Sequence, residues 1–210
     1  MSTNLSKPMT WILVLAVAAC EPSLAGPEAS VEDVPTSARA MVGGGRMHAD
    51  VMDQNGIDVY SADGATMIRQ PNGLRLSLTM PTPEAGEYVY ASGTVEGHPE
   101  LFTLWAFVFN HPENCTFPCS GDDLGPGTGA DGGAYNVGGV VSGGGTLNIA
   151  GRIGIGEEPF VFSPLELPAT AEVHLAIAPH GALDPSSLPN ELRIPTGNSM
   201  CGCWWVAVFD

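Results

Sequence analysis

The chain has little positive charge and no apolar run long enough to span a membrane. Its 210 residues include one lysine, Lys7, and six arginines against 23 Asp and Glu, which gives a formal net charge of −16. So acidic a surface repels phosphate backbones and anionic lipid headgroups. We therefore expect no nucleic-acid binding and no peripheral membrane attachment through basic patches.

Motifs of common catalytic sites are also missing. The sequence contains no G-x-S-x-G nucleophile elbow, no H-E-x-x-H zinc motif and no Walker-type loop. The glycine runs VGGG and SGGGT lack the lysine and the strand-to-helix context of a phosphate cradle. We therefore predict that the protein is not an enzyme.

Few stretches are free of helix-breaking residues, because the chain holds 27 Gly and 18 Pro. Strand patterns are present instead. In GLRLSLTM, which begins at Gly73, four apolar side chains alternate with Arg75, Ser77 and Thr79. This period of two is typical of a half-buried strand. The segment LFTLWAFVFN, from Leu101, is apolar on both faces and predicts a central strand covered on both sides.

Further strand candidates follow the same logic: EYVYASGTVEG, AYNVGGVVS, GTLNIAGRIGI, PFVFS, AEVHLAIA and CWWVAVF. The last of these alternates Trp204, Val206 and Val208 with Trp205, Ala207 and Phe209, which predicts a strand in the interior of a sheet. Roughly nine or ten strands without a convincing helix predict an all-β fold. We expect an antiparallel β-sandwich over residues 46–210, with a closed β-barrel as the alternative.

The N-terminus carries the segment TWILVLAVAACEPS. Its apolar run, residues 11–19, is too short to cross a bilayer, which takes roughly 20 apolar residues. A cation, a short apolar region and small residues before a processing point predict a signal peptide over residues 1–19. An ordinary secretory signal with a coincidental cysteine is one interpretation.

The tetrapeptide Val17-Ala18-Ala19-Cys20 also resembles the lipobox of bacterial lipoproteins. This resemblance implies cleavage before Cys20, a diacylglycerol on its sulfur and an acyl chain on its new amine. It places the protein in the bacterial cell envelope, and Glu21 in the next position points to the outer membrane. Residues 20–45 would then be the lipidated cysteine and a flexible acidic tether, because this segment has no aromatic side chain and many small ones.

Four cysteines remain: Cys115, Cys119, Cys201 and Cys203. An even number in an exported chain favours disulfides, with three possible pairings. A zinc site is the alternative, although the single residue between Cys201 and Cys203 is shorter than the usual spacing. The Pro-flanked loop permits a local bridge between Cys115 and Cys119, which would leave the other two to pair or to stay reduced.

Two further groups of side chains are candidate metal ligands. His111, His174 and His180 could bind copper or zinc, if loops that are distant in sequence converge. The alternative is that these are scattered histidines with structural or surface roles. A Gly-rich loop holds three aspartates that could bind calcium weakly, although it lacks EF-hand spacing and a solvated acidic loop is the default: Asp122, Asp123 and Asp131.

Two segments, NHPENCTFPC and AEVHLAIAPHGAL, resemble parts of an uncharacterised family of exported bacterial β-rich proteins, over residues 87–210. A late strand with a histidine before small residues also resembles chordin-type (CHRD) domains. Here Glu172 stands where that pattern has its first histidine, and no glycine follows His174. Neither resemblance implies an activity.

The sequence thus predicts a lipid-anchored, extracytoplasmic module for binding or surface structure. Its expected partners are the membrane, through the lipid, and an unknown protein or small ligand. A periplasmic copper- or zinc-binding protein is the alternative, and otherwise we expect no cofactor.

Overall fold

The computed structural model describes residues 45–53, 57–84, 99–116, 118–193 and 205–210. These residues contain no α-helix, and none of their helices is long and apolar enough to cross a membrane. Three short 3-10 helices lie in loops: η1 (Pro112–Asn114), η2 (Gly121–Asp123) and η3 (Asn190–Arg193). The strands are β1 (Arg46–Met52), β2 (Val59–Gln70), β3 (Gly73–Pro81), β4 (Glu100–Phe109), β5 (Gly132–Val141), β6 (Thr146–Gly154), β7 (Val161–Phe162), β8 (Glu172–Ala182) and β9 (Trp205–Phe209).

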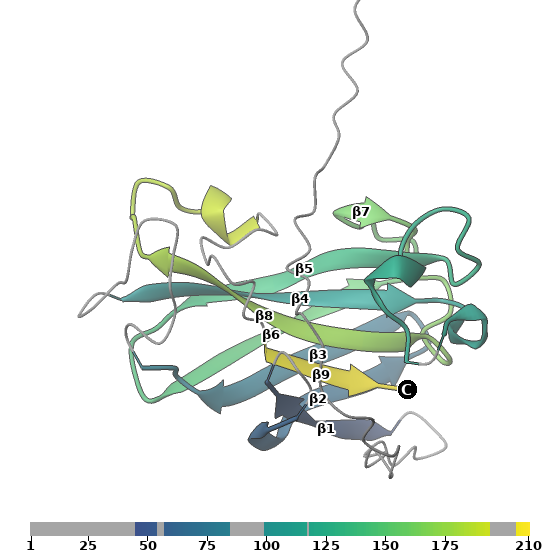
Figure 1. Ribbon diagram of the computed structural model, residues 1–210. Helices are drawn as coiled ribbons and strands as arrows, with labels where there is room; N and C mark the ends of the chain where they lie inside the picture. The colour runs from purple at the N-terminus through teal and green to yellow at the C-terminus, as the bar shows by residue number, and fades with distance from the viewer. Residues whose placement is uncertain (1–44, 54–56, 85–98, 117, 194–204) are drawn as a thin grey trace, which may run out of the picture. The chain divides into compact units, whose positions relative to one another are not determined.

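All nine strands form one antiparallel sheet in the order β6-β3-β2-β1-β9-β8-β4-β5-β7 (Figure 1). The prediction of an all-β antiparallel fold is therefore confirmed. The sheet curls in the manner of half a barrel, which corresponds to the barrel-like alternative rather than to two separate sheets.

The curl brings β5 and β6 into contact, although hydrogen bonding places them near opposite ends of the strand order. Gly151 of β6 permits the approach, because a Cβ on it would lie 2.2 Å from the carbonyl oxygen of Val137 on β5. A side chain at this position would force the two strands apart.

The main core fills the inner, concave face of the sheet. On β3 the side chains of Leu74, Leu76, Leu78 and Met80 are buried while Arg75 is exposed, which confirms the predicted alternation. The inner faces of β4, β8 and β9 contribute Leu104, Leu175 and Phe209, among others, to the same core.

The outer face differs between two halves of the sheet. In the half made of β6, β3, β2 and β1, here called the open half, the outer side chains are exposed or half-buried. In the half made of β9, β8, β4, β5 and β7, here called the covered half, loops lie over the outer faces of β4 and β8. Trp105 of β4 is only 1% exposed there, and Phe160 of the 155–170 loop packs edge-on against it at 5.4 Å between ring centroids. The prediction that β4 is covered on both sides is thus confirmed.

β9 lies between β1 and β8 and joins the two halves (Figure 1). It pairs with β8 over five residues and meets β1 at Met52 and Val206. The expectation of an interior strand at this position is confirmed. Trp204 and the predicted strand EYVYASGTVEG lie outside the described residues.

Candidate functional site

The three histidines proposed as metal ligands have separate surroundings. His174 and His180 both lie on β8, six residues apart, which is about 20 Å at the rise of a strand. His111 follows β4 and pairs with Glu113, with Nδ1 and Oε1 3.2 Å apart. The structure does not bring these histidines together. Within the described part of the chain, no three His, Cys, Asp or Glu side chains are grouped so that they could hold a metal ion.

His180 is buried on the outer face of the covered half. Its Nε2 lies 2.7 Å from Thr103 Oγ1, and Trp105 Nε1 donates to the same hydroxyl at 3.0 Å. Burial lowers the pKa of His180 from its ordinary value, so the neutral imidazole is favoured. These three side chains satisfy one another, and His180 is therefore a structural histidine.

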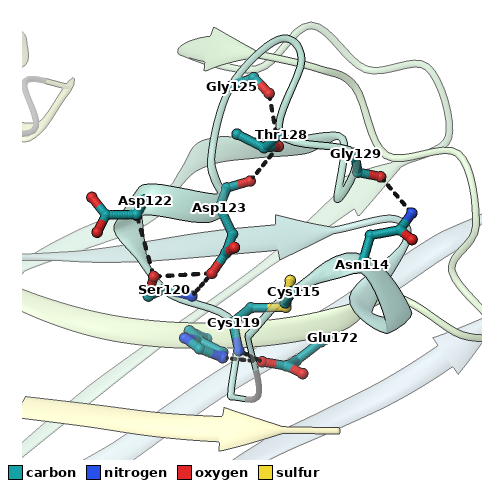
Figure 2. Close-up of a disulfide and its surroundings, with 11 residues drawn as sticks. Asn114, Cys115, Cys119, Ser120, Asp122, Asp123, Gly125, Thr128, Gly129 and Glu172 are labelled. Carbon is teal, nitrogen blue, oxygen red and sulfur yellow. Dashed lines mark hydrogen bonds and ion pairs between the residues drawn. A yellow bond between two sulfur atoms is a disulfide. The ribbon is translucent and has the colours of Figure 1, made fainter.

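Glu172 and His174 fasten the loop that holds Cys115 and Cys119. These two cysteines form a disulfide, and the Cys119 backbone N–H donates to Glu172 Oε1 at 2.8 Å (Figure 2). His174 Nε2 lies 2.6 Å from the same oxygen, so the carboxylate, which is 1% exposed, is satisfied where it is buried. This is the local bridge that the Pro-flanked loop was expected to permit, one of the pairings left open by the sequence. Cys20, Cys201 and Cys203 lie outside the described residues.

Two of the three aspartates considered for calcium, Asp123 and Asp131, form hydrogen bonds with serine. Asp123 Oδ2 accepts from the backbone N–H and the hydroxyl of Ser120, which begins η2 in a capping box (Figure 2). Asp131 accepts a hydrogen bond from the Ser163 hydroxyl. The carboxylates of Asp123 and Asp131 therefore hold the loop rather than converge on a common point.

An open groove lies on the outer face of the open half. Its volume is about 520 Å³, and strands β1, β2, β3 and β6 all contribute to its lining. The residues that line it are Arg46, Thr66, Ile68, Arg75, Leu76, Ser77, Ala150, Gly151 and Arg152. Three of the six arginines of this acidic chain are thus gathered in one place.

Strand register aligns these arginines in a single row across the sheet. Arg46 of β1 is paired with Ile68 of β2, Ile68 with Arg75 of β3, and Arg75 with Arg152 of β6. Residues directly opposite on neighbouring strands have Cβ atoms about 5 Å apart, and like charges in this position are destabilising. The pairing of Arg75 with Arg152 is therefore unfavourable for the protein alone.

No carboxylate of the described residues forms an ion pair with an arginine of the row. The ion pairs found in the described residues both involve histidine rather than arginine. The contrast with Arg69, on the same strand as Ile68, is clear. Arg69 is half-buried, and its Nη1 donates to the carbonyl oxygens of Pro168 and Ala171, each at 2.8 Å. Arg69 has a structural role, whereas the three groove arginines present their guanidinium groups to solvent.

Polar side chains beside the row complete the groove. Arg75 Nε donates to Gln70 Oε1 at 3.2 Å, which restrains the guanidinium group and does not use its Nη donors. The next row along the strands pairs Thr66 with Ser77, both half-buried and both hydroxyl-bearing. Arginines flanked by hydroxyl groups form a donor-rich surface that suits an oxyanion.

Sequence reasoning missed this groove. The strands at residues 46–52 and 59–70 were not predicted, and they supply Arg46, Thr66 and Ile68. One signal was present: Arg75 and Arg152 both occupy outward positions of predicted strands. No family profile, curated protein or solved structure matches the chain.

Proposed function

We propose that the protein is an extracytoplasmic binding module, anchored to the bacterial cell envelope through lipid on Cys20, and that its arginine groove holds a small anionic ligand. The observation that carries the proposal is the row of three arginines, with which no carboxylate of the described residues forms an ion pair. An anion bound between Arg75 and Arg152 would relieve the repulsion between them.

The ligand is small because the rest of the protein repels extended polyanions. Against a net charge of −16, attraction extends only as far as the local field of the groove, about 8 Å at physiological salt. A nucleic acid would run beyond the groove and meet acidic surface. A compact anion would be attracted without that penalty.

Binding rather than catalysis suits the lining. None of the residues that line the groove is an Asp, Glu, His or Cys, although the Thr66 hydroxyl in the lining lies 3.3 Å from His48 Nδ1 on the neighbouring strand. Its side chains are donors and apolar groups, which recognise and hold a ligand.

The anchor rests on the lipobox-like segment that ends at Cys20. A cysteine with several acyl chains would remain in the membrane, because two chains already give stable anchoring. The tether would carry the groove away from the bilayer, whose anionic headgroups the acidic surface repels.

Titration calorimetry of the full chain with inorganic phosphate, sulfate and citrate tests the groove. We expect at least one of these anions to bind, and Arg75→Gln to weaken it about tenfold or more, since a hydrogen bond to a charged group contributes about 1.5–3 kcal/mol. Arg193→Gln is the matched control, because this exposed arginine of η3 lies outside the groove lining. Absence of binding for all three anions, or equal losses in the two variants, would contradict the proposal.

Metabolic labelling with radioactive palmitate tests the anchor. We expect label in the native protein and none in Cys20→Ala. Label retained by that variant, or none in the native protein, would rule out the lipid on Cys20 and would leave the groove proposal standing.

A further inference from the structure

The three groove arginines are not evenly spaced. Arg75 and Arg152 are on adjacent strands, about 5 Å apart, whereas Arg46 and Arg75 are separated by two strand spacings, about 10 Å. The groove therefore contains a paired cationic position and a single one.

The paired position suits a tetrahedral oxyanion. Two planar guanidinium groups can each donate two parallel hydrogen bonds to a phosphoryl or sulfate group. Gln70 already holds Arg75 through its Nε, and the Ser77 hydroxyl is the next outward side chain on the same strand. Both features reduce the freedom that ligand binding would otherwise have to remove.

Ile68 separates the two positions. It lies between Arg46 and Arg75 in the row, is half-buried and lines the groove. A hydrated polar linker crossing this side chain would lose hydrogen bonds to water without finding a partner. An apolar linker would instead bury area against it.

We infer that the ligand carries two tetrahedral oxyanion groups, phosphoryl or sulfate, about 12 Å apart and joined by an apolar linker. This inference rests on the proposed function of the groove. One anionic group would lie between Arg75 and Arg152, and the other would lie at Arg46. Joining the two groups raises the affinity, because the second contact becomes intramolecular.

A length series of probes tests the inference on the full chain by calorimetry. The probes are inorganic phosphate and the bisphosphates of ethanediol, hexanediol and dodecanediol, with hexanediol bis-sulfate to distinguish the two oxyanions. We expect hexanediol bisphosphate, whose extended length matches the spacing, to bind about tenfold or more tightly than phosphate. The shorter and longer bisphosphates should show a smaller gain.

Three variants give the series its controls. Arg46→Gln should remove the preference for the hexanediol probe, so that the three bisphosphates bind alike. Ile68→Ser should weaken the hexanediol probe more than it weakens phosphate, because it removes the apolar contact. Arg193→Gln should preserve the whole length profile.

The outcomes separate this inference from the proposed function. Phosphate that binds as tightly as hexanediol bisphosphate, with Arg46→Gln weakening both equally, would indicate a site for one anion; the proposed function would stand and the two-group ligand would be overturned. Equal affinities for the three bisphosphates would likewise indicate a site for one anion and overturn the two-group ligand. Absence of binding for every probe would overturn both.

Discussion

The open and covered halves of the sheet share an inner face of the same kind and differ in the outer one. In the covered half, outward side chains such as Trp105, Thr103 and His180 are 2% exposed or less. In the open half, the outward side chains Arg46, Arg75 and Arg152 are exposed. Loops have turned one outer face into a second, smaller core, and the other outer face is left uncovered.

The two halves also differ in whether their charged side chains have partners of opposite charge or hydrogen-bond donors. The covered half contains the buried carboxylate of Glu172, which is satisfied by His174 and by the Cys119 N–H. The open half places Arg75 opposite Arg152, and no carboxylate of the described residues forms an ion pair with either. Charges are satisfied where the structure depends on them and unsatisfied where, on our proposal, a ligand binds.

Truncation of an outer-face side chain should give the largest contrast between the halves. Trp105→Ala should lower the free energy of unfolding by about 3–5 kcal/mol, because it removes a buried aromatic and its contact with Phe160. Ile68→Ala on the open half should cost about 1 kcal/mol, since Ile68 is half-buried. Urea denaturation at neutral pH measures both. Similar costs for the two variants would mean that the covered half has no second core.

Loss of the disulfide should have the next largest effect. The double variant Cys115→Ser with Cys119→Ser should lower the free energy of unfolding by about 2 kcal/mol, the loop-closure contribution expected for so short a loop. The bridge packs in the small cluster of Phe109 and Ala130, so fluorescence or hydrogen exchange should report loosening on the covered half alone. Protection lost equally from β3 and β6 would contradict this local role.

A smaller difference between the halves should appear in the pH dependence of stability, because the covered half buries His180. Burial lowers the pKa of His180 from 6.5, so the unfolded chain binds its proton first as the pH falls. The stability contributed by the neutral imidazole is complete above about pH 6.5 and declines as the pH falls from there toward the folded-state pKa. His180→Gln should flatten the stability profile between about pH 7.5 and about pH 5.5. Denaturation curves across that range give the slopes, and parallel profiles for the native protein and His180→Gln would refute the assignment.

The smallest predicted effect is a gain in stability, whereas the variants above lose stability. Arg152→Gln removes a like charge opposite Arg75, so the free energy of unfolding should rise by about 0.2–0.5 kcal/mol. Arg69→Gln should lower it, because the carbonyl oxygens of Pro168 and Ala171 lose their donor. Thermal melts in low salt, where surface repulsion is strongest, are the suitable measurement. A loss of stability in Arg152→Gln would show that the groove arginines support the fold.

The strands with strong patterns could be predicted from sequence, and the groove could not. Alternation in GLRLSLTM and the two-sided apolar run around Trp105 identified β3 and β4. Whether one or both faces of a strand are buried determines the pattern of apolar residues within that strand, so it can be recognised from a short segment. β1 alternates as well, with Met47, Ala49 and Val51 directed inward, but its seven residues are few. β2 is interrupted by polar residues and by Gly64, which hides its periodicity.

The groove depends on pairings between distant segments. Arg75 and Arg152 become neighbours only through the register of β3 with β6, and Arg46 joins them through β1 and β2. Composition even pointed away from such a site, since an acidic chain was expected to repel anions. A net charge describes the whole surface, while recognition depends on where a few charges of the minority sign are placed.

The central position of β9 determines when the domain can be completed. As the polypeptide leaves the ribosome, the segments that form β1 and β8 emerge before residues 205–209, and until then each lacks the neighbour that joins them. Pairings between residues so distant in sequence form slowly. The two halves of the sheet can therefore be joined only after residues 205–209 have been synthesised.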